Sequence, residues 1–426
     1  MENFIPFNSR FIPIFTFLFP NAYEYVGLLA MPSKRSIAFV ANTSWSIYKF
    51  RLYLIKKLIE QGLSLYVLAP RDEYTPQFEH IQGLTYIELT KFRGKSIYPL
   101  HDIQLYRELL GHYRQIRPDL IFHYTIKANI FGTLAAARTK SASISVITGL
   151  GYAFSGNRIL QHTVQVIYRG VLQKNEEVWF LNGDDRRIFI KEKLIRKEKA
   201  FLLPGEGVDT VAFYPSPYAN GAITPLSDSS VQQAHTGQPV TFLLIGRIIR
   251  HKGIHEYIRA AETLLQRGLK ARFQLLGFFD DNNPVAISRQ QVEEWVGQGI
   301  ITYLGHTDNV APFIERADCI ILPSYREGMP LSLLEGASMC KALIATDTAG
   351  CREIIRDGIN GYLCRNKDSG DLAEKMEKYY HLPAAEKRQM GIAGRDRVME
   401  QYTKEIVAGI YLDKINQFRA AGHEQR

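Results

Sequence analysis

The sequence has few cysteines, and their positions exclude the common cysteine-based sites. All four lie in the C-terminal half, at Cys319, Cys340, Cys351 and Cys364. No pair has the two-residue gap that zinc and redox motifs use. The simplest interpretation is reduced thiols in the core of a cytosolic protein, and we assign them no chemical role.

Long uninterrupted apolar runs are also missing. The most apolar stretch lies within residues 1–30, but Pro6, Pro13 and Pro20 interrupt it. A membrane-spanning helix needs about 20 apolar residues without such breaks, and a secretory signal has a basic start and a small-residue cleavage site. We interpret 1–30 as a leader from a mis-assigned start ahead of Met31, with an anchor at the membrane interface as the alternative.

The sequence contains no Asp-x-Asp motif, no short repeat, no heptad seam and no low-complexity tract. Adjacent aspartates occur in GDD at Gly183 and in FDD at Phe279. Adjacent acids without a third ligand are more typical of loops and helix starts than of a metal site. We therefore predict no cofactor and no required metal.

Positive charge is concentrated in the first half. Residues 31–200 contain 26 Lys and Arg against 14 Asp and Glu, whereas residues 201–426 contain 25 against 27. Such a field attracts nucleic acid, anionic lipid head groups or a phosphorylated substrate; an ordinary solvated surface is the alternative. The basic residues are scattered, without the patterning of a nucleic-acid-binding module, so no nucleic acid is expected.

A chain of 426 residues exceeds what one hydrophobic core usually supports, which suggests two domains. From Ser36 onward, short apolar runs alternate with amphipathic segments of helix length, such as 47–61 after the run at 37–41. This alternation is typical of parallel sheets covered on both faces by helices. Further strands are predicted at 63–69, 85–89, 119–124, 144–148, 177–182, 240–247, 271–277, 300–305, 318–323 and 342–347.

A stretch rich in proline, glycine and small polar residues divides the two sets of strands. We predict an N-terminal domain at 31–210, a linker or insertion at 211–239, a second domain at 240–395 and a helical segment at 396–426. The fold class is thus α/β, with two doubly wound, Rossmann-like parallel-sheet domains facing each other. In such sheets ligands bind at the carboxyl ends of the strands.

The stretch GRIIRHKG, from Gly246 to Gly253, follows a strand and opens a helix. Gly246 would let the chain turn sharply, and Arg247 and Lys252 supply positive charge. The helix start offers unpaired N–H groups to an anion. A diphosphate would suit this place, although an exposed basic loop is an equally simple interpretation.

The stretch SYREGMPLSLLEGAS has the same strand, loop and helix context. Glu335 falls in the second turn of the helix among leucines, where its carboxylate could accept two hydrogen bonds from a ribose diol. Glu327 lies on the loop before the helix and could meet a sugar hydroxyl. Acids favoured by a helix N-terminus would explain Glu327, but they explain Glu335 poorly.

Together with LGHTDNVAPFIERAD at 304–318 and TAGCREIIRDGINGYL at 348–363, these motifs resemble family 4 of the retaining nucleotide-sugar glycosyltransferases, which have the GT-B architecture. The likeness covers nearly all of residues 36–410. Segments 43–58, 122–136 and 146–154 resemble the branch that adds hexoses or hexosamines to polyprenyl-diphosphate-linked glycans.

The resemblance implies donor-side roles in the second domain. Arg247 and Lys252 would hold the donor diphosphate and stabilise the departing UDP, Glu335 would hold the ribose, and Glu327 would orient the sugar. The remaining donor-site positions implied are Gly246 in the loop of Arg247, Gly305 and His306 near the uracil, and Gly328, Met329, Pro330 and Leu331 near the sugar and diphosphate.

Roles in the first domain are also implied. His123 would bind sugar or act catalytically, although a histidine between Phe122 and Tyr124 also fits simple packing. Asn42 and Ser44 would offer donor contacts where many family members have a glycine pair. The acceptor side would include Lys127, Gly149, Gly151 and Tyr152; a solvated lysine and a tight turn are the alternatives.

The predicted function is transfer of a hexose or N-acetylhexosamine, with N-acetylgalactosamine as first candidate, from a UDP-sugar to a polyprenyl-diphosphate-linked saccharide in bacterial surface glycan synthesis. The resemblance implies retention and an α-linked product. We expect a cytoplasmic enzyme peripheral on the inner, anionic face of the membrane. The alternatives are an enzyme like UDP-N-acetylglucosamine 2-epimerase and a non-catalytic nucleotide-sugar-binding partner.

Overall fold

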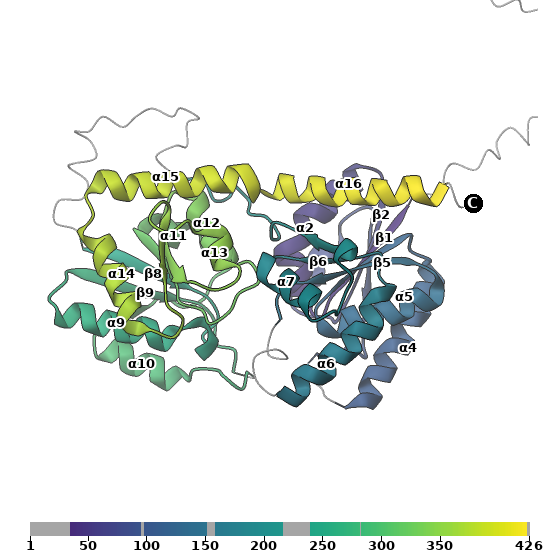
Figure 1. Ribbon diagram of the computed structural model, residues 1–426, viewed down its shortest axis with the longest axis horizontal. Helices are drawn as coiled ribbons and strands as arrows, with labels where there is room; N and C mark the ends of the chain where they lie inside the picture. The colour runs from purple at the N-terminus through teal and green to yellow at the C-terminus, as the bar shows by residue number, and fades with distance from the viewer. Residues whose placement is uncertain (1–34, 95–97, 151–157, 216–238, 282, 424–426) are drawn as a thin grey trace, which may run out of the picture.

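The computed structural model describes residues 35–94, 98–150, 158–215, 239–281 and 283–423. It contains two α/β halves that lie side by side (Figure 1). The segment 1–30 lies outside the described residues, as does most of the linker predicted for 211–239.

The N-terminal half is built on a seven-stranded sheet in which every pairing is parallel. The order β3-β2-β1-β4-β5-β6-β7 means that the chain reverses its direction across the sheet between β1 and β4. The strands are β1 (Ser36–Val40), β2 (Ser64–Ala69), β3 (Leu84–Glu88), β4 (Leu120–Tyr124), β5 (Ala142–Ile147), β6 (Glu177–Phe180) and β7 (Ala200–Leu202). Helices cover both faces of this sheet, so successive residues of a strand are buried on alternate faces and the strand sequences are continuously apolar.

The helices of this half are α2 (Ser44–Glu60), α3 (Pro76–Glu79), α4 (Pro99–Ile116), α5 (Thr133–Thr139), α6 (Arg158–Val171) and α7 (Gly183–Lys191), with a π-helical turn at Ala128–Gly132. Helix α2 begins three residues before the predicted start because Thr43 caps it. The Thr43 hydroxyl accepts a hydrogen bond of 3.2 Å from the Ser46 amide, which satisfies one of the free amides of a helix start.

The C-terminal half repeats the same topology with six parallel strands in the order β10-β9-β8-β11-β12-β13. They are β8 (Val240–Ile245), β9 (Ala271–Leu276), β10 (Thr302–Tyr303), β11 (Cys319–Leu322), β12 (Ala342–Thr346) and β13 (Gly361–Cys364). The helices are α9 (Ile254–Gln266), α10 (Arg289–Gly297), α11 (Ala311–Arg316), α12 (Leu331–Ser338), α13 (Cys351–Ile354) and α14 (Ser369–His381). Two doubly wound parallel sheets confirm the predicted fold class.

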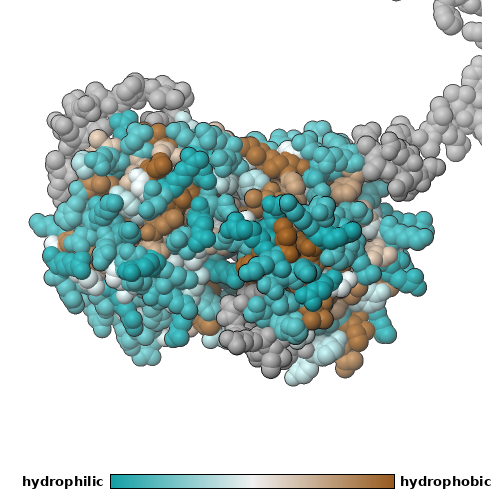
Figure 2. Space-filling model, viewed as in Figure 1, coloured by the Kyte–Doolittle hydropathy of each residue, from teal (hydrophilic) through white to brown (hydrophobic). Residues whose placement is uncertain are grey.

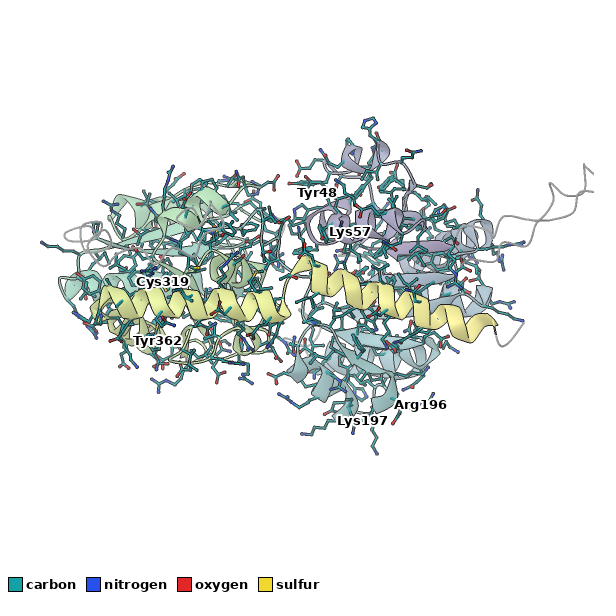
Figure 3. All side chains as sticks on the ribbon, turned by 90° about the horizontal axis from the view of Figure 1, so that it is seen from above. Tyr48, Lys57, Arg196, Lys197, Cys319 and Tyr362 are labelled. Atoms are coloured by element: carbon teal, nitrogen blue, oxygen red, sulfur yellow. The ribbon has the colours of Figure 1, made fainter. Side chains whose placement is uncertain are left out.

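Two C-terminal helices connect the halves. Helix α15 (Ala384–Gln401) lies along the C-terminal half and α16 (Lys404–His423) continues across the N-terminal half (Figure 3). In α16, the Tyr411 ring packs against Phe122 and Trp179, with centroids 4.9 and 4.8 Å apart. The segment predicted as helical at 396–426 therefore begins within α15, and the described part of α16 packs on the core of the first half through Tyr411.

The chain passes from one half to the other near Val208 and again between α15 and α16, and these two crossings are hydrogen-bonded to each other. The Val208 amide donates to the Tyr402 carbonyl (2.8 Å), and the Lys404 amide donates to the Val208 carbonyl (3.1 Å). Gly207 has φ +75°, and a Cβ there would lie 2.8 Å from the backbone of Lys404. Only glycine fits this close approach without strain.

Among the described residues, no helix is long and apolar enough to cross a membrane. The surface in Figure 2 is mainly hydrophilic, with separate apolar patches.

Candidate active site

The carboxyl ends of β8 and β9 are joined to the following loops by backbone hydrogen bonds. The Gly246 amide donates to the Leu276 carbonyl (3.0 Å), and the Gly277 amide donates to the Gly305 carbonyl (2.9 Å). A Cβ on Gly277 would lie 1.8 Å from the Gly246 carbonyl oxygen. Gly277, which the sequence did not single out, is therefore the glycine that lets these backbones meet.

The chain bends at Gly246, as predicted, but the residue that requires the backbone freedom of glycine is Gly253. Gly246 does not have a positive φ, and a Cβ there would make only ordinary contact with Lys252 at 3.6 Å. Gly253 has φ +72°, and its Cβ would lie 1.9 Å from the Pro323 carbonyl oxygen. The left-handed residue directly before α9 is the one that requires glycine.

Lys252 and Glu327 meet at this edge of the sheet. The Lys252 Nζ lies 2.6 Å from Glu327 Oε1, and the side chains are only 20% and 13% exposed. Arg247 stands nearer the solvent, where its guanidinium lies 3.2 Å from Asp280 Oδ2. The structure therefore brings one predicted cation into direct contact with one predicted acid.

Glu335 projects from the second turn of α12 into a nearly buried position, with 4% of its surface exposed. Burial raises the pKa of its carboxyl group to about 7, and the positive charges of Lys49 and Lys404 partly oppose this shift. Both lysines belong to elements of the N-terminal half, α2 and α16. No hydrogen bond or ion pair of the Glu335 carboxylate is found within the described part of the chain.

The loop between the two glutamates touches the opposite half. A Cβ on Gly328 would lie 2.0 Å from the Thr148 carbonyl oxygen. Gly149, with φ +144°, lies behind that carbonyl, and a Cβ there would be 3.6 Å from the Gly328 Cα. Asn182 also donates its side-chain amide to the Gly328 carbonyl (2.9 Å). Gly328 is thus the point at which the strand-end loops of the two halves press together.

The other implied residues of this half lie around that loop. Pro330 occupies the position directly before α12, where Leu331 begins the helix. Met329 packs against the core of the N-terminal half. His306 is exposed, and its ring lies edge-on to Phe278 at 5.2 Å.

His123 does not face the other half, and the structure supports the packing alternative. It lies within β4, is fully buried, and its Nε2 is 2.9 Å from the Tyr113 hydroxyl. Gly132 stands directly against the ring, since a Cβ there would lie 2.4 Å from it. Burial lowers the pKa of His123 to about 3, so the imidazole is neutral at physiological pH. A sugar-binding or catalytic role does not fit this position.

The Ser44 hydroxyl is also turned inward. It is fully buried and donates to the Pro70 carbonyl (2.9 Å). The nearby amide of Trp45 donates to the Asp72 carboxylate (2.8 Å), so an acid of the chain already occupies this helix start. Asn42 is half-buried next to the start of α2. A donor contact through the Ser44 hydroxyl is therefore incompatible with the structure.

Lys127 is a paired lysine. Its Nζ lies 2.6 Å from Asp102 Oδ1, and the two side chains are 15% and 23% exposed. This arrangement differs from the solvated alternative and leaves the ammonium engaged by α4. Gly151 and Tyr152 lie outside the described residues.

The adjacent aspartates of the GDD sequence join the two halves. Asp185, which is fully buried, lies 2.6 Å from the Arg326 guanidinium, and Asp184 lies 2.9 Å from Arg352. The Gly183 amide donates to the Glu353 carboxylate (2.8 Å). Each aspartate has its own arginine from the opposite half, so the pair acts as an interdomain clamp. Within the described ranges, no group of three or more His, Cys, Asp or Glu side chains could hold a metal.

A cavity of about 800 Å³ lies next to this clamp, between α7 and the loops that follow β11 and β12. Four basic side chains and one acid contribute to its walls, namely Arg187, Lys191, Arg326, Arg352 and Asp184. The Arg326 Nε, buried beside it, has no hydrogen-bond partner. This is a positively charged recess between the halves.

A second buried ion pair was not anticipated from the sequence. Arg51 of α2 contacts Glu206 at the crossing between the halves, and its guanidinium carbon lies 3.6 Å from the centroid of the Tyr124 ring. The only sign of this pair in the sequence is that Arg51 falls on the apolar face of a predicted amphipathic helix. Its acidic partner is 155 residues away in the sequence.

Two family descriptions match the chain, one in each half. Residues 36–182 match "Glycosyl transferase 4-like" and residues 239–381 match "Glycosyl transferases group 1". The first matched range contains β1 to β6 and the second contains β8 to β13, whereas α7 and β7 lie in the unmatched stretch between them.

Curated relatives match across much of the chain. One is an N,N'-diacetylbacillosaminyl-diphospho-undecaprenol alpha-1,3-N-acetylgalactosaminyltransferase of Campylobacter jejuni, 27% identical over 88% of this chain and 97% of the relative. Another is a capsular polysaccharide biosynthesis glycosyltransferase of Staphylococcus aureus, 24% identical over 72% and 80%. A third is a UDP-Gal:alpha-D-GlcNAc-diphosphoundecaprenol alpha-1,3-galactosyltransferase of Escherichia coli, 22% identical over 62% and 67%.

Solved structures share the whole fold. A sucrose-phosphate synthase from Thermosynechococcus elongatus superposes with a TM-score of 0.75 at 19% identity, over 91% of this chain and 100% of the other. Anabaena HepE in complex with UDP superposes with a TM-score of 0.69 at 15% identity, over 90% and 100%. These likenesses confirm the GT-B arrangement of two facing domains.

Proposed function

Because this chain is a glycosyltransferase of group 1, in family 4, we propose that it transfers a sugar from a UDP-sugar to a polyprenyl-diphosphate-linked saccharide. The transferred sugar is a hexose or an N-acetylhexosamine, with N-acetylgalactosamine as the first candidate. The single observation that carries the assignment of the site is the Lys252–Glu327 pair at the strand ends of the C-terminal half.

Lys252 changes partner when the donor binds. Without a donor, its ammonium neutralises Glu327 at 2.6 Å. A donor diphosphate supplies more negative charge than one carboxylate, so it draws the ammonium away, and Arg247 adds charge from the solvent side. The freed Glu327 then accepts hydrogen bonds from hydroxyls of the donor sugar.

Catalysis follows from the same charges. As the bond to the sugar breaks, negative charge grows on the departing UDP, and fixed cations that face it lower the barrier. The amides at the start of α12, at Leu331, add the positive end of a helix dipole. Lys252, Arg247 and these amides supply the positive charge that a metal ion would otherwise provide, and we propose that no metal is required.

Glu335 holds the ribose. Its carboxylate is buried and has no partner among the described side chains, and two hydroxyls of a ribose would satisfy it. The lysines that stabilise its charge, Lys49 and Lys404, come from the other half of the molecule. Closure of the two halves therefore favours the ionised form that accepts these hydrogen bonds.

The acceptor assignment is supported by the relatives. By their names, the Campylobacter and Escherichia proteins act on diphospho-undecaprenol-linked sugars, and the Staphylococcus protein acts in capsule synthesis. We assign this chain to bacterial surface glycan synthesis, with retention at the anomeric carbon and an α-linked product. It works at the inner face of the cytoplasmic membrane, where such acceptors carry their diphosphate.

A donor panel tests this proposal. Purified protein is incubated with single UDP-sugars and a synthetic polyprenyl-diphosphate-linked sugar, and the products are identified by mass spectrometry. We expect one hexose or N-acetylhexosamine added to the lipid-linked acceptor in the presence of a chelator. A converted donor without acceptor would indicate the epimerase alternative. Bound UDP-sugar without any turnover would indicate the non-catalytic alternative.

A further inference from the structure

Helix α4 carries an exposed apolar tip at its beginning. Tyr98, directly before the helix, is 68% exposed, Leu100 is 72% exposed and Ile103 is 47% exposed. Three large apolar side chains within six residues form the densest such group in the described part of the sequence. Figure 2 shows hydrophobic surface at the lower edge of the N-terminal half, below the position of α4 in Figure 1.

The outer face of α4 changes from apolar to basic along its length. Ile103, Arg107 and Arg114 are exposed and follow Leu100 at helical spacing. The rise of a helix places Arg107 about 6 Å beyond Ile103 along the axis. In a bilayer the acyl chains lie inside the layer of head-group phosphates. A helix with an apolar end and cations one turn further along matches this order, because its apolar end can enter the acyl chains while its cations meet the phosphates.

The acids of α4 do not face outward with these cations. Asp102 is bound to Lys127. Glu108 accepts hydrogen bonds from the amides of Thr90 (2.8 Å) and Lys91 (3.0 Å), so it holds the loop after β3 against the helix. That loop adds the exposed side chains of Lys91 and Arg93 to the same region. The tip is therefore surrounded by positive charge.

Helix α6 of the same half also carries exposed apolar side chains. Val166 is 50% exposed and Ile167 is 38% exposed. Both α4 and α6 project from the lower side of the N-terminal half in Figure 1. Five of the eleven most exposed large apolar side chains in the described part of the chain thus belong to α6, α4 and the residue before α4.

The tip lies at the edge of the sheet where the site is. Helix α4 connects β3 to β4, which run parallel, so its first turn stands at the carboxyl end of the strands. Thr148 and Asn182, which touch the Gly328 loop, follow β5 and β6 at that same edge. A surface docked on the tip is therefore next to the opening between the two halves.

We propose that the α4 tip, formed by Tyr98, Leu100, Ile103 and Arg107, docks the protein on an anionic bilayer. The proposal rests on the proposed function, since a lipid-linked acceptor presents its diphosphate at the head-group level. Charge complementarity selects this occupant over a second copy of the chain. A symmetric contact between two tips would bring the same cations together, whereas acidic lipids neutralise them.

The test is flotation of the full chain with vesicles of phosphatidylglycerol and phosphatidylcholine at low salt. The variant Leu100→Ser/Ile103→Ser is expected to bind at least tenfold more weakly than the unchanged protein. The matched control Ile359→Ser/Val296→Ser alters two exposed apolar residues of the C-terminal half and is expected to bind normally. Equal binding by the tip variant and the control would overturn the proposal.

Charge is tested separately by Arg107→Gln against Arg272→Gln, an exposed arginine on β9. Loss of one interfacial arginine weakens binding to acidic vesicles by roughly fivefold, and we expect this only for Arg107. Equal binding to vesicles of phosphatidylcholine alone would overturn the anionic specificity. A dimer that dissociates in the tip variant while vesicle binding persists would favour the second-copy alternative and overturn the proposal.

This binding needs no donor sugar, so it can be measured separately from sugar transfer. We further expect the tip variant to retain turnover with a short-chain acceptor in detergent and to lose it with a vesicle-bound acceptor. If the unchanged protein binds vesicles normally but neither it nor the tip variant transfers sugar, the proposed function is rejected and the docking surface is retained. Normal turnover by the tip variant on vesicle-bound acceptor would reject the docking surface instead.

Discussion

The two halves share one strand order, yet their strand-end edges are used differently. In the C-terminal half, Lys252 and Glu327 lie on loops beyond the strands and meet each other at the edge. In the N-terminal half, His123 lies inside β4 and Ser44 in the first turn of α2, and both side chains are buried. A strand residue points at a face of the sheet, where helices cover it, whereas a loop residue is free to face the other domain. Shared topology therefore locates the loops but not the site residues.

The largest effect is expected from the loop residues. Lys252→Ala and Glu327→Ala should each reduce turnover by about 100-fold or more, because a charge that faces the reacting groups is lost. The control is Glu377→Ala, which breaks an ion pair with Arg267 elsewhere in the same half. Unfolding transitions close to the wild type would show that the variants are folded. Near-normal turnover by either variant would place the reacting groups elsewhere.

Glu335→Gln should separate donor binding from stability. The KM for the UDP-sugar should rise by about tenfold or more, since an ionised acceptor is lost. The folded state raises the pKa of Glu335 from 4.5 to about 7, so it binds a proton that the unfolded state releases over this range. The stability that this provides is present below pH 4.5 and is lost as the pH rises to 7. The variant should therefore be more stable than the wild type at pH 8, as measured by urea unfolding.

A result in which Glu335→Gln shows an unchanged donor KM would remove the ribose assignment. Unchanged stability at pH 8 would mean instead that solvent reaches the carboxylate. The exposed Glu293→Gln, on α10, is the matched control and should alter neither quantity.

The clamp between the halves should give a stability effect of middle size. Removing one partner of a buried ion pair costs roughly 3 kcal/mol, so Asp185→Asn should lower the melting temperature clearly. The double variant Asp185→Asn/Arg326→Gln should be less destabilised than the sum of the two single changes. Additive effects would show that the 2.6 Å contact contributes little. The pair Asp281 and Arg289, which is exposed on the surface, serves as the control.

The smallest of these effects is expected at His123. Folding lowers its pKa from 6.5 to about 3, so the unfolded state binds an extra proton between these values. The stability it provides is present above pH 6.5 and is lost as the pH falls, by about 2 kcal/mol between pH 7 and pH 5. In His123→Gln this part of the pH dependence should disappear, while turnover per folded molecule stays close to normal. The exposed His162→Gln is the control.

A large loss of turnover in folded His123→Gln would contradict the assignment of His123 to packing. It would mean that a buried histidine of the first half takes part in the chemistry, and the contrast between the two edges would no longer hold.

Much of the fold could be predicted because each strand is a local apolar run. The order of the strands could not, since it depends on pairing between distant segments. Site residues could be predicted where they belong to a local sequence pattern, as Lys252 and Glu327 do in the motifs that follow strands. The interdomain partners of Asp184 and Asp185 are more than 140 residues away, and no spacing in the sequence indicates them.

The packing of Tyr411 and its neighbours on the first sheet has a consequence for synthesis. Val407, Ala408 and Ile415 complete the apolar core around Phe122, although they lie more than 200 residues beyond β7, the last strand of that sheet. A nascent chain that has left the ribosome up to residue 202 holds every strand of its first sheet, yet still exposes the aromatic groove that α16 will fill. The first domain to be made is therefore finished only after the second sheet has been translated, and its exposed groove requires protection until then.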